Sequence, residues 1–134
     1  MVLDTSAIIA ILFDEPDAEV LERQIVDDPV RLVSAGSVIE ATIIIESRLG
    51  DAGGREFDLW LQRASIEIVP VDVEQTEMAR RAWRRFGKGR HPAGLNYGDC
   101  FYGDCFSYAL AATRDEPLPF KDNDCARTDA RRCI

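Results

Sequence analysis

The first ten residues place a carboxylate between two apolar segments. Residues 2–3 suit a short buried strand, and residues 7–10 form a second apolar run. Between them lie Asp4, Thr5 and Ser6, three residue types that favour the N-cap of a helix. In open α/β sheets, ligands bind at the edge where the strands end and the helices begin. Asp4 is therefore either a helix cap or a ligand at that edge.

Short apolar segments alternate with helical patterns along the rest of the chain. This alternation predicts an α/β/α sandwich with a central, mostly parallel sheet of about four to five short strands. We expect strands at residues 2–3, 31–33, 66–71 and 118–120, and helices at residues 7–13, 17–26, 38–49, 56–64, 73–86 and 97–113. The helix at 38–49 is mostly apolar, so we expect it to be buried and to end at Gly50, before a loop at 53–54. Residues 1–134 are expected to form a single domain.

The cysteines and the apolar runs limit the classes to which the chain can belong. Four cysteines and a single histidine lack the spacing of a structural zinc site, so we expect free, mostly buried thiols at Cys100, Cys105, Cys125 and Cys133. No apolar run approaches the length of a membrane span, and no secretory signal is visible. The expected compartment is the cytoplasm.

The basic residues are clustered although the chain as a whole is acidic. The formal net charge of −8 is unusual for a nucleic-acid-binding protein. Within one short stretch, however, lie Arg80, Arg81, Arg84, Arg85, Lys88 and Arg90. The cluster is either a solvated helix face or a surface that binds the phosphate backbone of RNA.

Several carboxylates are expected to converge at the sheet edge that contains Asp4. The others are Glu40 in the apolar helix, Asp99 and Asp104 near the start of the last helix, and Asp124 after the last strand. Each also has a local explanation, as a helix cap, a turn residue or a solvated acid. Clustered carboxylates repel one another unless a cation lies between them, and all-oxygen ligands suit Mg²⁺ or Mn²⁺. The pattern therefore predicts a magnesium site, with manganese as the alternative ion.

A set of short motifs is distributed along the chain. They are VLDTSA at 2–7, Glu40 in its apolar helix, GKGRH at 87–91, LNYGDC at 95–100, FKxND at 120–124 and TD at 128–129. Over residues 1–129 this set resembles the PIN-domain toxins of type II toxin–antitoxin modules, the VapC ribonucleases. The resemblance implies a PIN-like fold and a magnesium-dependent endoribonuclease that cleaves tRNA or other structured RNA. It also implies a homodimer and neutralisation by a VapB-type antitoxin.

The resemblance also implies roles for the predicted acids. The acidic quartet of the family falls on Asp4, Glu40, Asp124 and one of Asp99 or Asp104. Asp4 and the acid of the last helix are expected to hold the metal, with Glu40 and Asp124 completing its shell or orienting the attacking water. The hydroxyl residue that follows the first acid in the family corresponds to Thr5 or Ser6.

Because of a duplicated segment, the identity of one predicted metal ligand is undecided. The pentapeptide YGDCF occurs at 97–101 and again at 102–106, where the family has one copy. Five helical residues rotate the chain by about 500°, so the two aspartates lie about 140° apart and cannot share one ligand position in a regular helix. Asp104 is favoured over Asp99 because it keeps the family-like spacing to Asp124.

Two further functions remain open from the sequence. The duplication and the altered C-terminus, with Asp122 and Cys125 where the family usually has other residues, are compatible with an impaired module that binds antitoxin or RNA without cleavage. A phospho-accepting signalling domain would use Asp72 after the third expected strand and Lys121 after the fourth. That class needs a second acid beside Asp4, and hydroxyl residues occupy that place.

Overall fold

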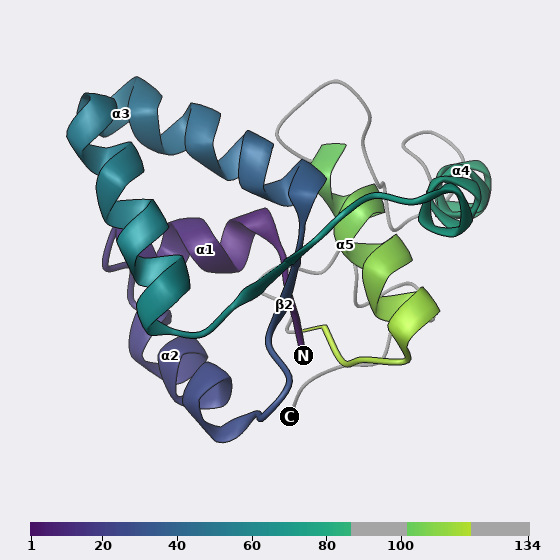
Figure 1. The fold of residues 1–134 in the computed structure, drawn as a ribbon, viewed down its shortest axis with the longest axis horizontal. Coiled ribbons are helices and arrows are strands. Elements are labelled where there is room, and N and C mark those ends of the chain that lie inside the picture. Colours follow the sequence, from purple (N-terminus) through teal and green to yellow (C-terminus); the bar gives the residue numbers. More distant parts are fainter. Residues whose placement is uncertain (87–101, 119–134) are drawn as a thin grey trace.

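The core of the fold is a small parallel sheet with helices on both faces (Figure 1). The computed structural model describes residues 1–86 and 102–118. Within these ranges the strands are β1 (Val2–Leu3), β2 (Leu32–Ser34) and β3 (Glu67–Val69), in the order β1-β2-β3. Both pairings are parallel, with Leu3 opposite Val33. The predicted α/β fold with a parallel sheet is confirmed.

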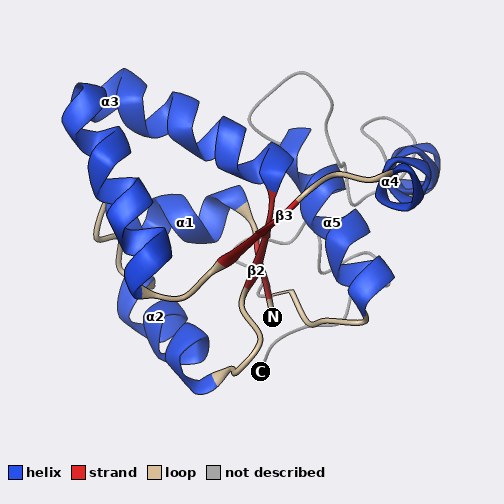
Figure 2. Cartoon of the chain, viewed as in Figure 1, coloured by secondary structure: helices blue, strands red, loops and turns tan. Residues whose placement is uncertain are grey.

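One face of the sheet is covered by the helices that follow β1 and β2. They are α1 (Thr5–Leu12), α2 (Ala18–Asp27) and α3 (Ala35–Arg63). Leu3 and Val33 are fully buried in this layer, together with apolar side chains from all three helices. Figure 2 shows these helices on one side of the strands.

The other face is covered by α4 (Val73–Phe86) and α5 (Tyr102–Arg114). Val2 and Leu32 belong to this second core because successive residues of a strand point to opposite faces. The N–H of Val2 donates to the carbonyl of Pro117 at 2.8 Å, so the chain after α5 returns alongside β1. Buried Leu118 begins the expected fourth strand, whose residues 119–120 lie outside the described ranges.

The segment α3 confirms one expectation about residues 35–63 and corrects another. Its first helix ends at Gly50, whose φ and ψ are non-helical, so two helices meet there at a kink, as expected. The expected loop at 53–54 is wrong, because Gly53 and Gly54 are buried within the second helix. A Cβ on Gly53 would lie 2.6 Å from the Cβ of Leu49, so glycine permits the close packing of the turns on either side of the kink.

The first half of α3 is less buried than its composition suggested. Ile39 and Ile43 are 63% and 62% exposed, whereas Ala41 and Ile45 are fully buried. The prediction of a buried helix was wrong for this face, because only one side of the helix packs against the core. Among the described residues, no helix is both long and apolar enough to cross a membrane.

The kink at Gly50 gives a prediction about stability. Its φ of 68° and ψ of −164° lie in a region that is accessible essentially only to glycine. We expect Gly50→Ala to lower the free energy of unfolding by about 1–3 kcal/mol, measured by urea denaturation. Nothing lies within 4 Å of the position of the added Cβ, so the loss would come from backbone strain alone.

The matched control is Gly54→Ala in the same helix. Its Cβ would meet the end of the exposed and flexible Glu46 side chain, which can move away. Since alanine is about 1 kcal/mol better than glycine inside a helix, this variant should be neutral or stabilising. Equal stability losses in both variants would contradict the backbone explanation.

Candidate functional site

Asp4 joins β1 to α1 and caps the helix. Its Oδ1 accepts a hydrogen bond from the N–H of Ala7 at 2.9 Å, and its Oδ2 accepts one from the hydroxyl of Ser6 at 2.9 Å. The side chain is only 6% exposed. The capping interpretation is therefore correct. It does not exclude a ligand role, because a carboxylate has about four acceptor positions.

Ser34 starts a second helix next to Asp4. Leu3 pairs with Val33, so the residues that follow them, Asp4 and Ser34, lie at the same end of neighbouring strands. The Oγ of Ser34 accepts a hydrogen bond from the N–H of Gly36 at 3.3 Å and caps α3. The N-termini of α1 and α3 therefore meet at the carboxyl edge of the sheet, as the sequence predicted.

A contact between α3 and α5 relates Glu40 to Asp104. The hydroxyl oxygens of Ser37 and Ser107 lie 3.2 Å apart, and both residues are fully buried. Glu40 lies one turn after Ser37 in α3, and Asp104 lies one turn before Ser107 in α5, so each acid is a same-face neighbour of a contacting serine. Glu40 and Asp104 therefore lie on the helix faces that contain this contact.

The two helices approach closely because the residues at the contact are small. A Cβ on Gly36 would lie 2.7 Å from the ring of Phe106, so any other residue there would force the helices apart. Both carboxylate oxygens of Glu40 and the Oδ2 of Asp104 are shielded from solvent.

The donor chemistry of the site fits a hard divalent cation. The hydroxyl of Thr5, directly after Asp4, is buried and has no hydrogen-bond partner within the described ranges. Together with the carboxylates it supplies only oxygen, the element that Mg²⁺ and Mn²⁺ prefer. Within residues 1–86 and 102–118, no three acidic, cysteine or histidine side chains form a group able to hold a metal ion. The other two predicted acids, Asp99 and Asp124, lie outside these ranges.

Cys105 is a buried thiol next to Asp104. It is free and 9% exposed, and burial together with the negative charge of Asp104 raises the pKa of its thiol to about 11. The thiol is therefore protonated at neutral pH. Cys100, Cys125 and Cys133 lie outside the described residues.

The basic cluster divides into two groups on α4. Arg80 forms an exposed ion pair with Glu77 at 2.7 Å, whereas Arg81, Arg84 and Arg85 line a pocket between α4 and α5. Lys88 and Arg90, which were predicted to extend the cluster, lie outside the described ranges.

Asp72, the acceptor required by the signalling hypothesis, has a structural role. Its Oδ1 accepts a hydrogen bond from the N–H of Gln75 at 2.8 Å at the start of α4. Lys121, the other residue of that hypothesis, lies outside the described ranges. Nothing in this geometry favours a phospho-accepting site.

Comparisons with known proteins decide the family. A family model described as PIN domain matches residues 1–131. The chain belongs to the PIN-domain family. A ribonuclease VapC from Mycolicibacterium smegmatis is 59% identical over 96% of both chains, and ribonuclease VapC30 from Mycobacterium tuberculosis is 52% identical over 96% of this chain and 95% of its own length. The predicted resemblance to the VapC ribonucleases is thereby confirmed.

A solved structure supports the same PIN fold. The M. tuberculosis VapC20 toxin, which is described as cleaving the sarcin–ricin loop, superposes with a TM-score of 0.75. The alignment covers 98% of this chain and 97% of that toxin, at 15% sequence identity. At this identity the likeness establishes the fold.

Sequence patterns did not indicate the contact between α3 and α5. Neither Ser37 nor Ser107, which form it, was among the candidate residues. The available signal was their spacing, since each serine lies three residues from a predicted acid in a largely apolar helix. Tyr108 was also missed as part of the pocket lined by the arginines.

The capping role of Asp4 predicts different outcomes for two substitutions. Asp4→Ala removes the acceptor for the Ala7 N–H and should lower the free energy of unfolding by about 1 kcal/mol. Asp4→Asn keeps an acceptor oxygen and should lose less than half of that, because asparagine caps helices as well as aspartate does. Urea denaturation of both variants without added metal checks the difference; equal losses would contradict the cap.

Proposed function

We propose that this chain is a magnesium-dependent endoribonuclease toxin, with manganese as the alternative ion. The observation that carries the proposal is the set of buried carboxylate oxygens in a PIN domain from Asp4 before α1, Glu40 in α3 and Asp104 in the first turn of α5. The activity is further supported by a relative of 59% identity that is named a ribonuclease. The proposed substrate is tRNA or another structured RNA.

The acids have separate proposed roles. Asp4 and Asp104 hold the cation, and the hydrogen bond from Ser6 fixes the Asp4 carboxylate in position. Glu40 and Asp124 complete the shell or orient the attacking water, which Glu40 can do from oxygens shielded from bulk solvent. When bound, the ion stabilises charge on the scissile phosphate and makes a coordinated water more acidic. Basic residues of α4 and the following segment bind the RNA backbone.

Cleavage should depend on both the cation and the acids. We expect purified protein to cleave a tRNA pool in Mg²⁺ or Mn²⁺ and to lose activity in excess EDTA. Asp4→Asn and Glu40→Gln should each reduce the cleavage rate by about 100-fold or more, since such a metal site contributes several kcal/mol. Asp58→Asn, an exposed acid on α3, is the matched control and should cleave like the unmodified chain.

The same assay separates the open alternatives. Asp104→Asn should lose cleavage and calorimetric Mg²⁺ binding, whereas Asp99→Asn should retain both; the reverse result would make Asp99 the ligand. RNA binding without turnover in excess metal would instead support the impaired module. Wild-type activity in Asp4→Asn, or cleavage that persists in EDTA, would overturn the mechanism.

We also propose that the chain forms a homodimer and is neutralised by a cognate VapB-type antitoxin. Ile39 and Ile43, exposed on the same face of α3, offer an apolar surface for self-association. In light scattering coupled to size exclusion, Ile39→Asn/Ile43→Asn should run as a monomer. Val26→Asn, which alters an exposed apolar residue on α2, should remain dimeric. A dimeric double variant would exclude this face, and a monomeric unmodified chain would exclude the dimer.

A further inference from the structure

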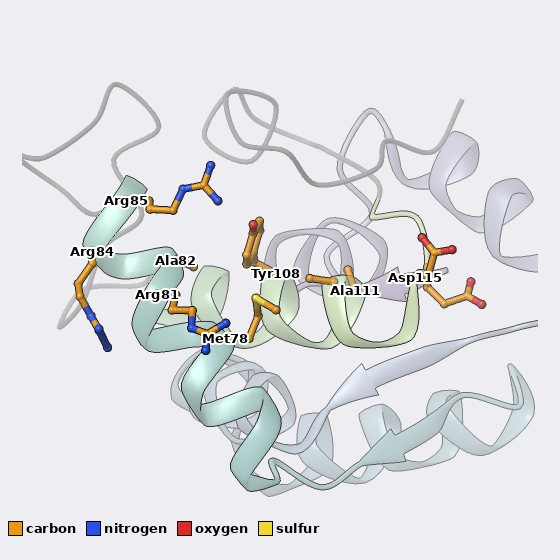
Figure 3. A pocket seen from close by; sticks show the side chains of 10 residues that line it. Met78, Arg81, Ala82, Arg84, Arg85, Tyr108, Ala111 and Asp115 are labelled. Atoms are coloured by element: carbon orange, nitrogen blue, oxygen red, sulfur yellow. The ribbon is translucent and has the colours of Figure 1, made fainter.

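A pocket between α4 and α5 extends the candidate site. Its volume is about 620 Å³, within the range of roughly 300–1,000 Å³ that is typical of small-molecule sites. Figure 3 shows it between the arginines of α4 and the C-terminal end of α5. Neither the predicted acids nor the proposed cleavage step uses this space.

The two ends of the pocket carry opposite charge, with an apolar wall between them. Arg81, Arg84 and Arg85 lie at the α4 end, and Asp115 lies at the other. Glu116, the next residue in sequence, also lines the pocket. The wall between the ends contains Met78, Ala82, Tyr108 and Ala111. A complementary ligand is therefore anionic at one end, flat or apolar in the middle, and a hydrogen-bond donor at the far end.

The two acids at the far end differ in exposure, since Glu116 is half-buried and Asp115 is exposed. The Oε2 of Glu116 accepts a hydrogen bond from the amino group of Met1 at 3.0 Å, so this side chain already supports the fold. Asp115 is exposed and follows the last residue of α5 with a φ of 51°. Asp115 is therefore the acid better placed to contact a ligand.

The pocket lies along the face of α5 that begins with Asp104. Tyr108, Ala111 and Asp115 follow Asp104 at intervals of four, seven and eleven residues, which keeps them on one side of the helix. At 1.5 Å per residue, Tyr108 lies about 6 Å and Ala111 about 10 Å along the axis from Asp104. An RNA strand bound at Asp104 can thus continue into the pocket.

We propose that this pocket binds the RNA nucleotide next to the cleaved phosphodiester and selects a base with an exocyclic amino group. The inference rests on the proposed ribonuclease function. The arginines bind backbone phosphate, the base lies against Tyr108 and Ala111, and Asp115 accepts a hydrogen bond from the amino group of the base. Uracil has no such amino group, so a carboxylate at this end disfavours it.

The test measures binding without turnover. Fluorescently labelled 12-nucleotide oligo(C) and oligo(U) are titrated with the full chain in EDTA, and fluorescence anisotropy gives the dissociation constants. We expect tighter binding of oligo(C), by about tenfold, since one base-specific contact is worth about 1–3 kcal/mol. In Asp115→Asn the preference for oligo(C) should fall to about twofold or less.

The arginines are tested by charge-neutral variants. Arg81→Gln/Arg85→Gln should weaken binding of both oligonucleotides at least tenfold. It should also reduce the slope of the logarithm of the binding constant against the logarithm of the salt concentration by about 1.4. Arg80→Gln is the matched control, because Arg80 is paired with Glu77 and does not line the pocket. It should change binding less than twofold, and thermal melting monitored by circular dichroism should show all variants folded.

The outcomes distinguish this inference from the proposed cleavage. Equal effects of Arg80→Gln and the double variant, or equal binding of oligo(C) and oligo(U), would overturn the nucleotide pocket. Binding of an oligo-glutamate peptide in place of RNA would also overturn it and would indicate a peptide site. If the chain shows the expected binding pattern but never cleaves RNA, the nucleotide-pocket proposal stands and the ribonuclease proposal is rejected.

Discussion

The parallel pairing of β1 with β2 is the constraint on which the site depends. It places Asp4 beside Ser34, so that one residue ends each strand and caps the following helix. A shift of one residue in this register would turn Leu3 out of the core and move the carboxylate away from the start of α3. The short strands carry little chemistry themselves, but their alignment brings the N-termini of two helices together. Because helix N-termini favour negative charge, this edge tolerates a buried carboxylate.

Close packing of α3 on α5 brings the helices that contain two further acids into contact. The contact needs small residues, and Gly36, Ser37 and Ser107 supply them. Glu40 and Asp104 each lie three residues from one of the contacting serines, and both have carboxylate oxygens shielded from solvent. Shielding a charged carboxylate is unfavourable unless another group compensates for its charge. This cost is the physical reason to consider both acids as ligands of a cation.

The sequence predicted the elements whose patterns are local, and missed those that depend on packing. The strand–Asp4–helix junction and the helix at 73–86 follow from apolar runs and capping residues, and the structure reproduces them. The break of α3 at Gly50 was predicted, but the helical conformation of Gly53 and Gly54 was not, because two adjacent glycines normally indicate a loop. Their burial depends on how the turns around Leu49 pack, which a linear pattern does not contain. The exposure of Ile39 has the same origin, since composition cannot tell which face a helix presents.

The site itself shows the same division. Asp4, Glu40 and Asp104 could be selected because an acid at a strand end or on an apolar helix is unusual. The serines that join α3 to α5 could not, because serine is a common residue and carries no charge. The sequence also could not show that the arginines form two groups. Arg80 and Arg81 are adjacent in sequence, but Arg80 pairs with Glu77, whereas Arg81 lines the pocket between α4 and α5. Net charge is thus a poor guide here, since a chain with a net charge of −8 still concentrates positive charge on a helix face that lines a pocket.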